Sequence, residues 1–126
     1  MKLYQYDEKL VRVTDPDGRV FSGAALFYPA EYCLHEYGRE EECLEIGGYV
    51  FYPADIARIE FLPTFEETLA AVPPGSRRFL DDDRYYTAVF VARHGLTQEP
   101  MVVCRPDLDD GSLWVFPADA WREGAP

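Results

Sequence analysis

The fold is decided by the stretch Leu44-Glu45-Ile46-Gly47-Gly48-Tyr49-Val50-Phe51-Tyr52-Pro53-Ala54-Asp55-Ile56-Ala57-Arg58-Ile59-Glu60-Phe61-Leu62. Apolar segments at 43–46 and 49–52 flank the pair Gly47-Gly48, which predicts two strands joined by a primed hairpin turn. Proline has no N–H to donate, so Pro53 is expected to end the second strand. Its fixed φ and the acid that follows favour a one-turn helix, and residues 57–62 are expected to form a further strand.

The end of this stretch, Tyr52-Pro53-Ala54-Asp55, recurs along the chain. Phe116-Pro117-Ala118-Asp119 repeats the aromatic residue, the proline, the alanine and the acid, and Arg122 follows it as Arg58 follows the first copy. Tyr28-Pro29-Ala30-Glu31 is a looser third copy. We interpret the first two copies as the same structural joint in two small modules. Its structural residues are Pro53, Asp55, Pro117 and Asp119, and the two acids are expected to cap or charge-stabilise the helices.

Turn signals divide the rest of the first half into short strands. Asp15-Pro16-Asp17-Gly18 predicts a tight turn between strands at 10–13 and 19–27. Gly23, in the middle of the second strand, predicts a bend or bulge. The acidic run Glu40-Glu41-Glu42 is expected to be the solvated tip of a hairpin.

The second half opens with a helix signal and then continues as strands. Residues 31–38, in the first half of the chain, do not indicate a single type of secondary structure. Thr64-Phe65-Glu66-Glu67 is a capping box that predicts a short helix, which Pro73-Pro74-Gly75 ends. The strands expected after it are residues 85–93, 101–105 and 113–116, with turns at 81–83 and 109–111 and a loop at 94–99.

Bulk properties restrict the class of protein. The chain has 126 residues, of which 48% are hydrophobic and 15% aromatic, and this suits one domain or two tightly joined modules. The net charge is -11, from 23 acids against 12 bases, and it disfavours nucleic acid as a partner unless the arginines cluster. The chain has no apolar run of membrane-spanning length and no signal-peptide pattern. We therefore expect a cytoplasmic protein with no membrane partner.

Cysteine and acid spacings do not predict a metal site. The three cysteines, Cys33, Cys43 and Cys104, are an odd number, which predicts reduced, partly buried thiols rather than a disulfide framework. Cys33, His35 and Cys43 fit no paired metal-ligand spacing and lack an evident fourth ligand. Asp107-x-Asp109-Asp110-Gly111 lacks the remaining ligands of a calcium loop and predicts a turn. No metal and no cofactor are expected.

Residues 10–62 resemble the Sm-like (LSm) small β-barrel. The resemblance rests on Val-x-Val at 11–13, Asp-Gly-Arg-Val-Phe-Ser-Gly at 17–23, and Leu-x-Ile-Gly-Gly-x-Val-Phe followed by Asp-Ile-x-x-Ile within 44–59. It implies a five-stranded barrel of a kind that commonly forms rings and binds RNA. The chain departs from both RNA-contact motifs of the family. Residues 28–32 supply no Asn, and residues 52–55 stand where the family has Arg-Gly, so no RNA-contact residue carries over.

Residues 76–124 are similar to a short bacterial domain family of unknown function with a Trp-Val-x-Pro motif. The matching positions are Ala92, His94, Thr97, Glu99, Val102, Val103, Arg105, Trp114, Val115, Pro117, Trp121 and Glu123. The chain departs from the family pattern at Phe116, where Arg is usual, and at Cys104, where Tyr is usual. The family has no established activity, so this resemblance implies a fold and no chemistry.

Together these features predict an all-β fold of two small antiparallel SH3/Sm-like β-barrel modules joined by a short helix. The expected boundaries are 1–63 for the Sm-like barrel, 64–75 for the helical linker and 76–126 for the second β module. The two strands that pair between subunits in Sm-like rings are here 49–52 and 57–62. Because the second module follows them closely and proteins usually cover such edges, we expect a monomer or dimer rather than a ring.

Six residues are candidates for ligand binding: His94, Thr97, Glu99, Trp114, Tyr52 and Asp55. His94, Thr97 and Glu99 share a loop after a long strand, where a structural role for His94 in holding the hairpin competes with a binding role. Trp114, together with Trp121, Tyr85 and Tyr86, could line a binding surface, but most of these aromatic residues are expected to fill the core. No catalytic set of acid, base and nucleophile is visible.

The leading prediction for function is a noncatalytic interaction or ligand-binding protein that takes a protein partner or associates with itself. Two alternatives remain open. One is an Sm-like RNA-binding protein, and the other is a small enzyme that uses His94 and nearby acids.

Overall fold

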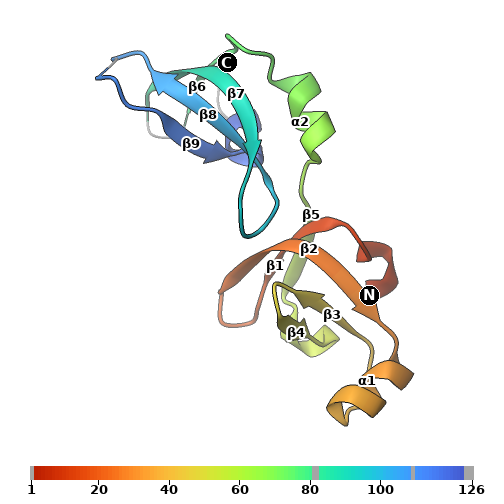
Figure 1. Ribbon diagram of the computed structural model, residues 1–126. Helices are drawn as coiled ribbons and strands as arrows, with labels where there is room; N and C mark the ends of the chain where they lie inside the picture. Colours follow the sequence, from red (N-terminus) through yellow and green to blue (C-terminus); the bar gives the residue numbers. More distant parts are fainter. Residues whose placement is uncertain (1, 81–82, 109, 124–126) are drawn as a thin grey trace. The chain divides into compact units, whose positions relative to one another are not determined.

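The computed structural model describes residues 2–80, 83–108 and 110–123, which form two compact units (Figure 1). The first unit comprises residues 1–62 with 96–98, and the second comprises the remainder of the chain. Each unit has its own antiparallel sheet and its own hydrophobic core. With 41% of residues in strands and 22% in helices, the predicted β class is confirmed.

The first unit is a five-stranded sheet in the order β4-β3-β2-β1-β5. Its strands are β1 (Leu10–Thr14), β2 (Val20–Tyr28), β3 (Cys43–Ile46), β4 (Tyr49–Phe51) and β5 (Arg58–Phe61). Its helical segments are η1 (Leu3–Tyr6), α1 (Ala30–Tyr37) and η2 (Pro53–Asp55). The edges of the sheet are β4 and β5, and no strand pairing joins them within the described residues. A closed barrel is therefore not confirmed.

The longest strand of this sheet, β2, pairs with two different partners. Residues 20–24 pair with β1, and residues 25–28 pair with β3. Gly23 lies just before the change of partner, where the sequence predicted a bend. A Cβ atom at Gly23 would lie 3.2 Å from Ile46 Cγ2, which is tighter than ordinary contact. The missing side chain therefore lets β3 pack closely against β2.

The β2–β3 connection differs from the prediction. Residues 30–37 form α1, and Gly38 ends the helix with φ 73° while its N–H donates to the Leu34 carbonyl at 3.0 Å. The residues at 40–42 lie in the loop between α1 and β3, so the predicted hairpin tip is wrong. Helix α1 begins directly after Pro29, which means that the third copy of the repeated tetrapeptide is also a strand-to-helix joint.

The second unit is a four-stranded sheet in the order β6-β7-β8-β9. Its elements are α2 (Phe65–Ala71), β6 (Arg77–Phe79), β7 (Tyr85–Arg93), β8 (Pro100–Pro106), β9 (Trp114–Pro117) and α3 (Ala118–Glu123). Strand β6 and the full length of α3 were not predicted. The pairing of β7 with β8 shifts register between Ala88 and Phe90, which marks an irregularity near the middle of β7.

The helix α2 confirms half of the predicted capping box. The Thr64 hydroxyl accepts a hydrogen bond from the Glu67 backbone N–H at 3.1 Å, which satisfies one free donor of the first turn.

The two units have separate hydrophobic cores. In the first unit the core contains Leu3, Tyr6, Val11, Val13, Ala25, Leu44, Ile46, Phe51 and Ile56. In the second unit it contains Val72, Leu80, Tyr86, Ala88, Val102, Cys104 and Trp121.

Both predicted joints connect a strand to a helix. At the first joint, β4 ends at Phe51, η2 begins at Pro53, and the Tyr52 N–H donates to Asp55 Oδ2 at 2.9 Å. At the second, β9 ends at Pro117 and α3 begins at Ala118, with Asp119 in its first turn. The second helix is longer than one turn because it continues to Trp121, which is buried in the core.

The first joint makes a stability prediction. Replacing Asp55 with alanine removes the acceptor of the Tyr52 N–H and is expected to lower the free energy of unfolding by about 0.5 to 2 kcal/mol. The matched control is Asp55→Asn, which keeps a side-chain oxygen at the same position and should cost less. Urea denaturation followed by far-UV circular dichroism measures both variants. Equal stability of the alanine variant and the parent protein would contradict the capping role.

Candidate functional site

The predicted ligand-binding residues fall in three places of the structure. His94, Thr97 and Glu99 belong to the loop between β7 and β8, where the His94 backbone N–H donates to the Glu99 carbonyl at 2.8 Å. This backbone bond closes the base of the loop. Trp114 begins β9 and pairs with Cys104, four positions along β8 from its first residue, so it lies away from the base of this loop.

The other two predicted residues, Tyr52 and Asp55, lie at the first joint in the first unit. The Arg39 guanidinium lies 3.9 Å from the centre of the Tyr52 ring, a cation–π contact that covers part of the tyrosine. The Asp55 carboxylate accepts the Tyr52 N–H and so caps the short helix η2. The six predicted residues therefore do not form a single binding site.

One groove lies in the second unit and contains Trp114. We call it the Trp114 groove. It has a volume of about 460 Å³. Its lining residues are Asp83, Arg84, Tyr85, Pro106, Asp107, Leu108, Asp110 and Trp114. Trp114 is 40% exposed and Tyr85 is 37% exposed, so part of each aromatic side chain is accessible to a ligand. Three aspartates against one arginine give the lining a negative balance.

Polar contacts hold the aromatic side chains of the Trp114 groove. The Trp114 indole Nε1 donates to the Ser112 hydroxyl at 3.0 Å. The Ser112 side chain and backbone N–H both bond to Asp110, and these hydrogen bonds lower the pKa of the Asp110 carboxyl. On the other wall the Arg77 guanidinium lies 3.9 Å from the centre of the Tyr85 ring and forms an ion pair with Asp107. The hydrogen bond to Asp107 raises the pKa of Arg77.

A second groove lies in the first unit and contains Tyr49. We call it the Tyr49 groove, and its volume is about 410 Å³. Its lining residues are Asp15, Pro16, Asp17, Arg19, Phe21, Tyr49, Val50, Phe51 and Asp55. The Phe21 ring centre lies 5.1 Å from that of Tyr49 and 5.0 Å from that of Phe51, which makes a continuous aromatic wall. This lining also has three aspartates and one arginine.

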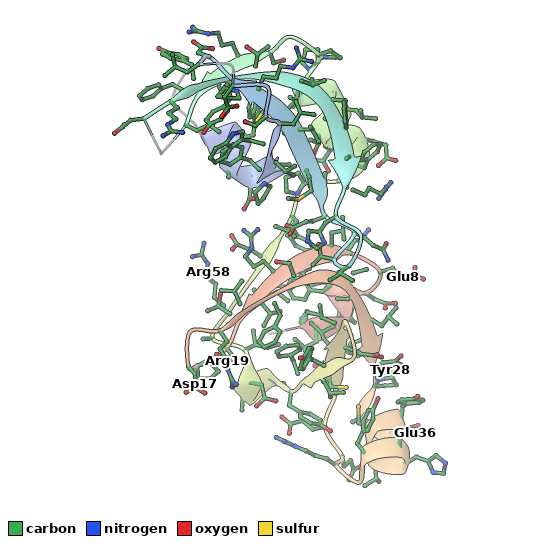
Figure 2. All side chains as sticks on the ribbon, turned by 60° about the vertical axis from the view of Figure 1, so that its left-hand side comes forward. Glu8, Asp17, Arg19, Tyr28, Glu36 and Arg58 are labelled. Atoms are coloured by element: carbon green, nitrogen blue, oxygen red, sulfur yellow. The ribbon has the colours of Figure 1, made fainter. Side chains whose placement is uncertain are left out.

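The β1–β2 turn forms the polar rim of the Tyr49 groove. The Asp15 carboxylate accepts hydrogen bonds from the Asp17 N–H at 2.9 Å and from the Arg19 N–H and Nε at 2.8 Å each. Burial tends to raise the pKa of Asp15, but the hydrogen bonds and the charge of Arg19 outweigh it and lower that pKa. Asp17 and Arg19 lie at the tip of the turn (Figure 2), where Arg19 also pairs with Asp17 at 3.3 Å.

The two grooves occupy corresponding places in the two units. Strands β1 to β4 and strands β6 to β9 are each four consecutive antiparallel strands paired in chain order. Each groove is lined by residues of the turn that joins the first two of these strands and by residues of the fourth strand. The Trp114 groove also takes Pro106, Asp107, Leu108 and Asp110 from the end of β8 and the β8–β9 connection, whereas the Tyr49 groove extends to Asp55 of the first joint. Neither groove was predicted from the sequence.

The remaining candidates of the sequence are the Cys33, His35 and Cys43 set and the acidic stretch at 107–111. His35 is exposed on α1, whereas Cys33 and Cys43 are buried, so the three do not converge. Nowhere in the described part of the chain do three or more His, Cys, Asp or Glu side chains group to hold a metal ion. In the predicted turn at 107–111, Asp107 pairs with Arg77, and Asp109 lies outside the described residues.

Among the described residues, no helix has the length and apolar content that a membrane-spanning helix needs.

Comparisons with known proteins add no relative to these observations. A scan against protein-family models, a search of curated proteins and a search of solved structures each found no match to the chain.

Proposed function

We propose that this protein is a noncatalytic interaction protein whose two grooves bind basic, apolar-containing segments of a partner protein. The observation that carries the proposal is a groove of similar composition in each unit. In each groove at least one exposed aromatic ring lies beside three aspartates and one arginine of the described residues. Each groove also contains the turn between the first two strands and part of the fourth strand of its sheet, and this shared construction supports a shared use.

The lining favours a ligand that carries cations on an apolar frame. Tyr49 and Trp114 offer flat apolar faces whose negative π surfaces also attract Lys and Arg side chains. Asp17, exposed at the rim of the Tyr49 groove, and Asp83, in the lining of the Trp114 groove, add negative charge. The net charge of the whole chain, -11, would draw a basic partner toward both grooves.

The two alternatives receive less support. Among the described residues that line the grooves there is no serine, cysteine or histidine, so a nucleophile with its base is not assembled there. RNA binding would need arginines free to meet phosphates. Five of them instead form ion pairs with acids of the same chain: Arg12, Arg19, Arg39, Arg58 and Arg77.

A pair of synthetic peptides tests the proposal. The probe is a ten-residue peptide in which lysine or arginine alternates with leucine and proline, and its control has glutamate at every basic position. Titration of the ¹⁵N-labelled full chain is expected to shift the amide resonances of groove residues with the basic peptide only. The shifts should weaken as salt is raised, because the attraction is between exposed charges.

Matched variants assign the binding to the grooves. Trp114→Ala and Tyr49→Ala are each expected to weaken binding at their own groove by about tenfold or more, as loss of a central aromatic contact does. The controls are Tyr4→Ala and Phe90→Ala, which remove exposed aromatic rings outside the grooves. Circular dichroism checks that each variant is folded. The proposal fails if neither peptide shifts any groove resonance, if the acidic peptide binds equally, or if the control variants weaken binding as much.

A further inference from the structure

Two cysteine thiols meet inside the first unit. Cys33 Sγ, from the middle of α1, lies 3.1 Å from Cys43 Sγ, from the first residue of β3. Both side chains are fully buried. They lie ten residues apart in the chain, and α1 with its following loop brings them together. Chance burial of small apolar side chains explains one such thiol, but not two with their sulfurs in contact.

Three tyrosines belong to the same elements as this pair of cysteines or directly precede them: Tyr28, Tyr32 and Tyr37. The Cys33 thiol donates to the Tyr28 carbonyl at 3.8 Å, and Tyr28 pairs with Cys43 between β2 and β3. The Tyr28 ring stacks on that of Tyr32 with ring centres 4.6 Å apart, and Tyr37 meets Tyr32 edge-on. Figure 2 shows Tyr28 at the end of β2 that leads into α1, while Glu36 points outward from that helix.

The closed site keeps the thiols unreactive. Burial, with the hydrogen bond between the Cys43 and Cys33 thiols, raises the pKa of Cys43 to about 12, so little of the nucleophilic thiolate exists there near neutral pH. A reagent therefore reaches the pair only when α1 moves aside. Helix α1 has eight residues and exposes Leu34 and Tyr37, so few buried contacts hold it, and such short elements open at low cost.

We propose that Cys33 and Cys43 form an oxidative modification site that takes a low-molecular-weight disulfide as its co-reactant. The sulfurs need to approach by only about 1 Å, since a disulfide bond is about 2.0 Å long. Their positions on α1 and β3 then become covalently joined. The expectation of reduced thiols without a disulfide, which came from the odd count of cysteines, holds on this view only for Cys104.

The exchange balances in two steps. The thiolate of one cysteine attacks a sulfur of the small disulfide, forms a mixed disulfide and releases one small thiol. The thiolate of the second cysteine then attacks the protein sulfur of that mixed disulfide, forms the Cys33–Cys43 bond and releases the second small thiol. The two protein thiols lose two electrons and two protons, and the small disulfide gains both. Excess small thiol reverses the reaction.

Cys104 provides an internal comparison. It is as deeply buried as the pair, but it lies in the second unit, where its thiol donates to the Trp114 carbonyl at 3.5 Å. No second cysteine of the chain belongs to that unit. Oxidation should therefore leave this thiol unchanged.

The test uses the full chain incubated with oxidised glutathione at neutral pH. Free thiols are then counted in denaturant after excess reagent is removed. We expect the count to fall from three to one, and low concentrations of urea should speed the fall because they favour opening of α1. Trypsin cleaves after Arg19, Arg39 and Arg58, so the product should contain segment 20–39 linked to segment 40–58, and a reductant should separate them.

Variants make the result decisive. In the Cys104→Ser variant, the number of free thiols should fall from two to none, and segments 20–39 and 40–58 should again be linked. The Cys33→Ser variant should form no disulfide between these segments. Three thiols that persist in the folded chain, while the urea-unfolded chain forms the link readily, would overturn the proposal. Linked segments that contain Cys104 would overturn it as well.

Discussion

Replacing Trp121 with alanine is expected to lower the free energy of unfolding of the second unit by about 3 to 5 kcal/mol. The side chain is only 1% exposed and is the largest of the fully buried ones in the described part of the chain. It comes from α3 and packs within the cluster that includes Tyr86 and Val102. Alanine would leave a large cavity at the point where the last helix is attached to its sheet.

The matched control is Trp121→Phe, which keeps an aromatic ring at this position. The indole Nε1 of Trp121 is buried and has no hydrogen-bond partner among the described residues. Phenylalanine removes this unpaired donor, which is unfavourable when buried, so part of the loss from reduced volume is offset. Urea denaturation followed by circular dichroism should show a much smaller loss for phenylalanine than for alanine. Equal losses would show that Trp121 does not fill the core as described.

Replacing Leu44 with alanine is expected to lower the free energy of unfolding of the first unit by about 2 to 5 kcal/mol. Leu44 is fully buried in β3, between Phe27 of β2 and Phe51 of β4 in the register of the sheet. The side chain thus packs against both neighbouring strands, which have little room to close the cavity. The control is Leu44→Met, which conserves most of the volume and should cost less than about 1.5 kcal/mol.

The positions of the tryptophans allow the two units to be followed separately. Both tryptophans of the chain, Trp114 and Trp121, belong to the second unit, so intrinsic fluorescence reports on that unit while circular dichroism reports on both. Leu44→Ala should shift the circular dichroism transition and leave the fluorescence transition in place. A joint shift of both signals would show that the two cores unfold as one.

Turn chemistry explains why most of the strands could be predicted. Gly47 and Gly48 have φ values of 58° and 87°, a region that side chains with a Cβ atom rarely adopt, so their presence requires a turn whatever surrounds it. The turn at 15–18 is likewise local, because Asp15 bonds to its own neighbours. Signals of this kind act within a few residues and can be read directly from the chain.

Elements that depend on distant partners were missed. Strand β6 contains two arginines in three residues and has no strand pattern of its own. It is a strand because it pairs with β7. Helix α1 contains tyrosine and cysteine, which do not favour helices strongly, although Pro29 and Gly38 mark its two ends. The sequence therefore contained the signals for both ends of the helix, but the residues between Pro29 and Gly38 did not indicate a helix.

In the candidate sites, too, single residues could be predicted from the sequence, whereas contacts between distant residues could not. Trp114 was singled out as an aromatic residue that might be open to a ligand, and it does line a groove. Tyr85, named with Trp114 from the sequence, lines the same groove, although it comes from a strand about thirty residues earlier in the chain. The pairing of β7 and β9 with β8, which brings the two residues into one sheet, is not contained in any local pattern. The contact of Cys33 with Cys43 was hidden for a similar reason, since it requires α1 to form between β2 and β3.

The proline at each joint also affects how the protein meets other chains. Both β4 and β9 are edge strands, and unpaired edges invite other strands to add and begin aggregation. Pro53 follows β4 after a single residue, and Pro117 is the last residue of β9. An added strand would find three or four residues, about 10 to 13 Å of ladder, before a position that has no N–H to offer. These two prolines therefore limit the length of ladder that an added strand could form at either edge.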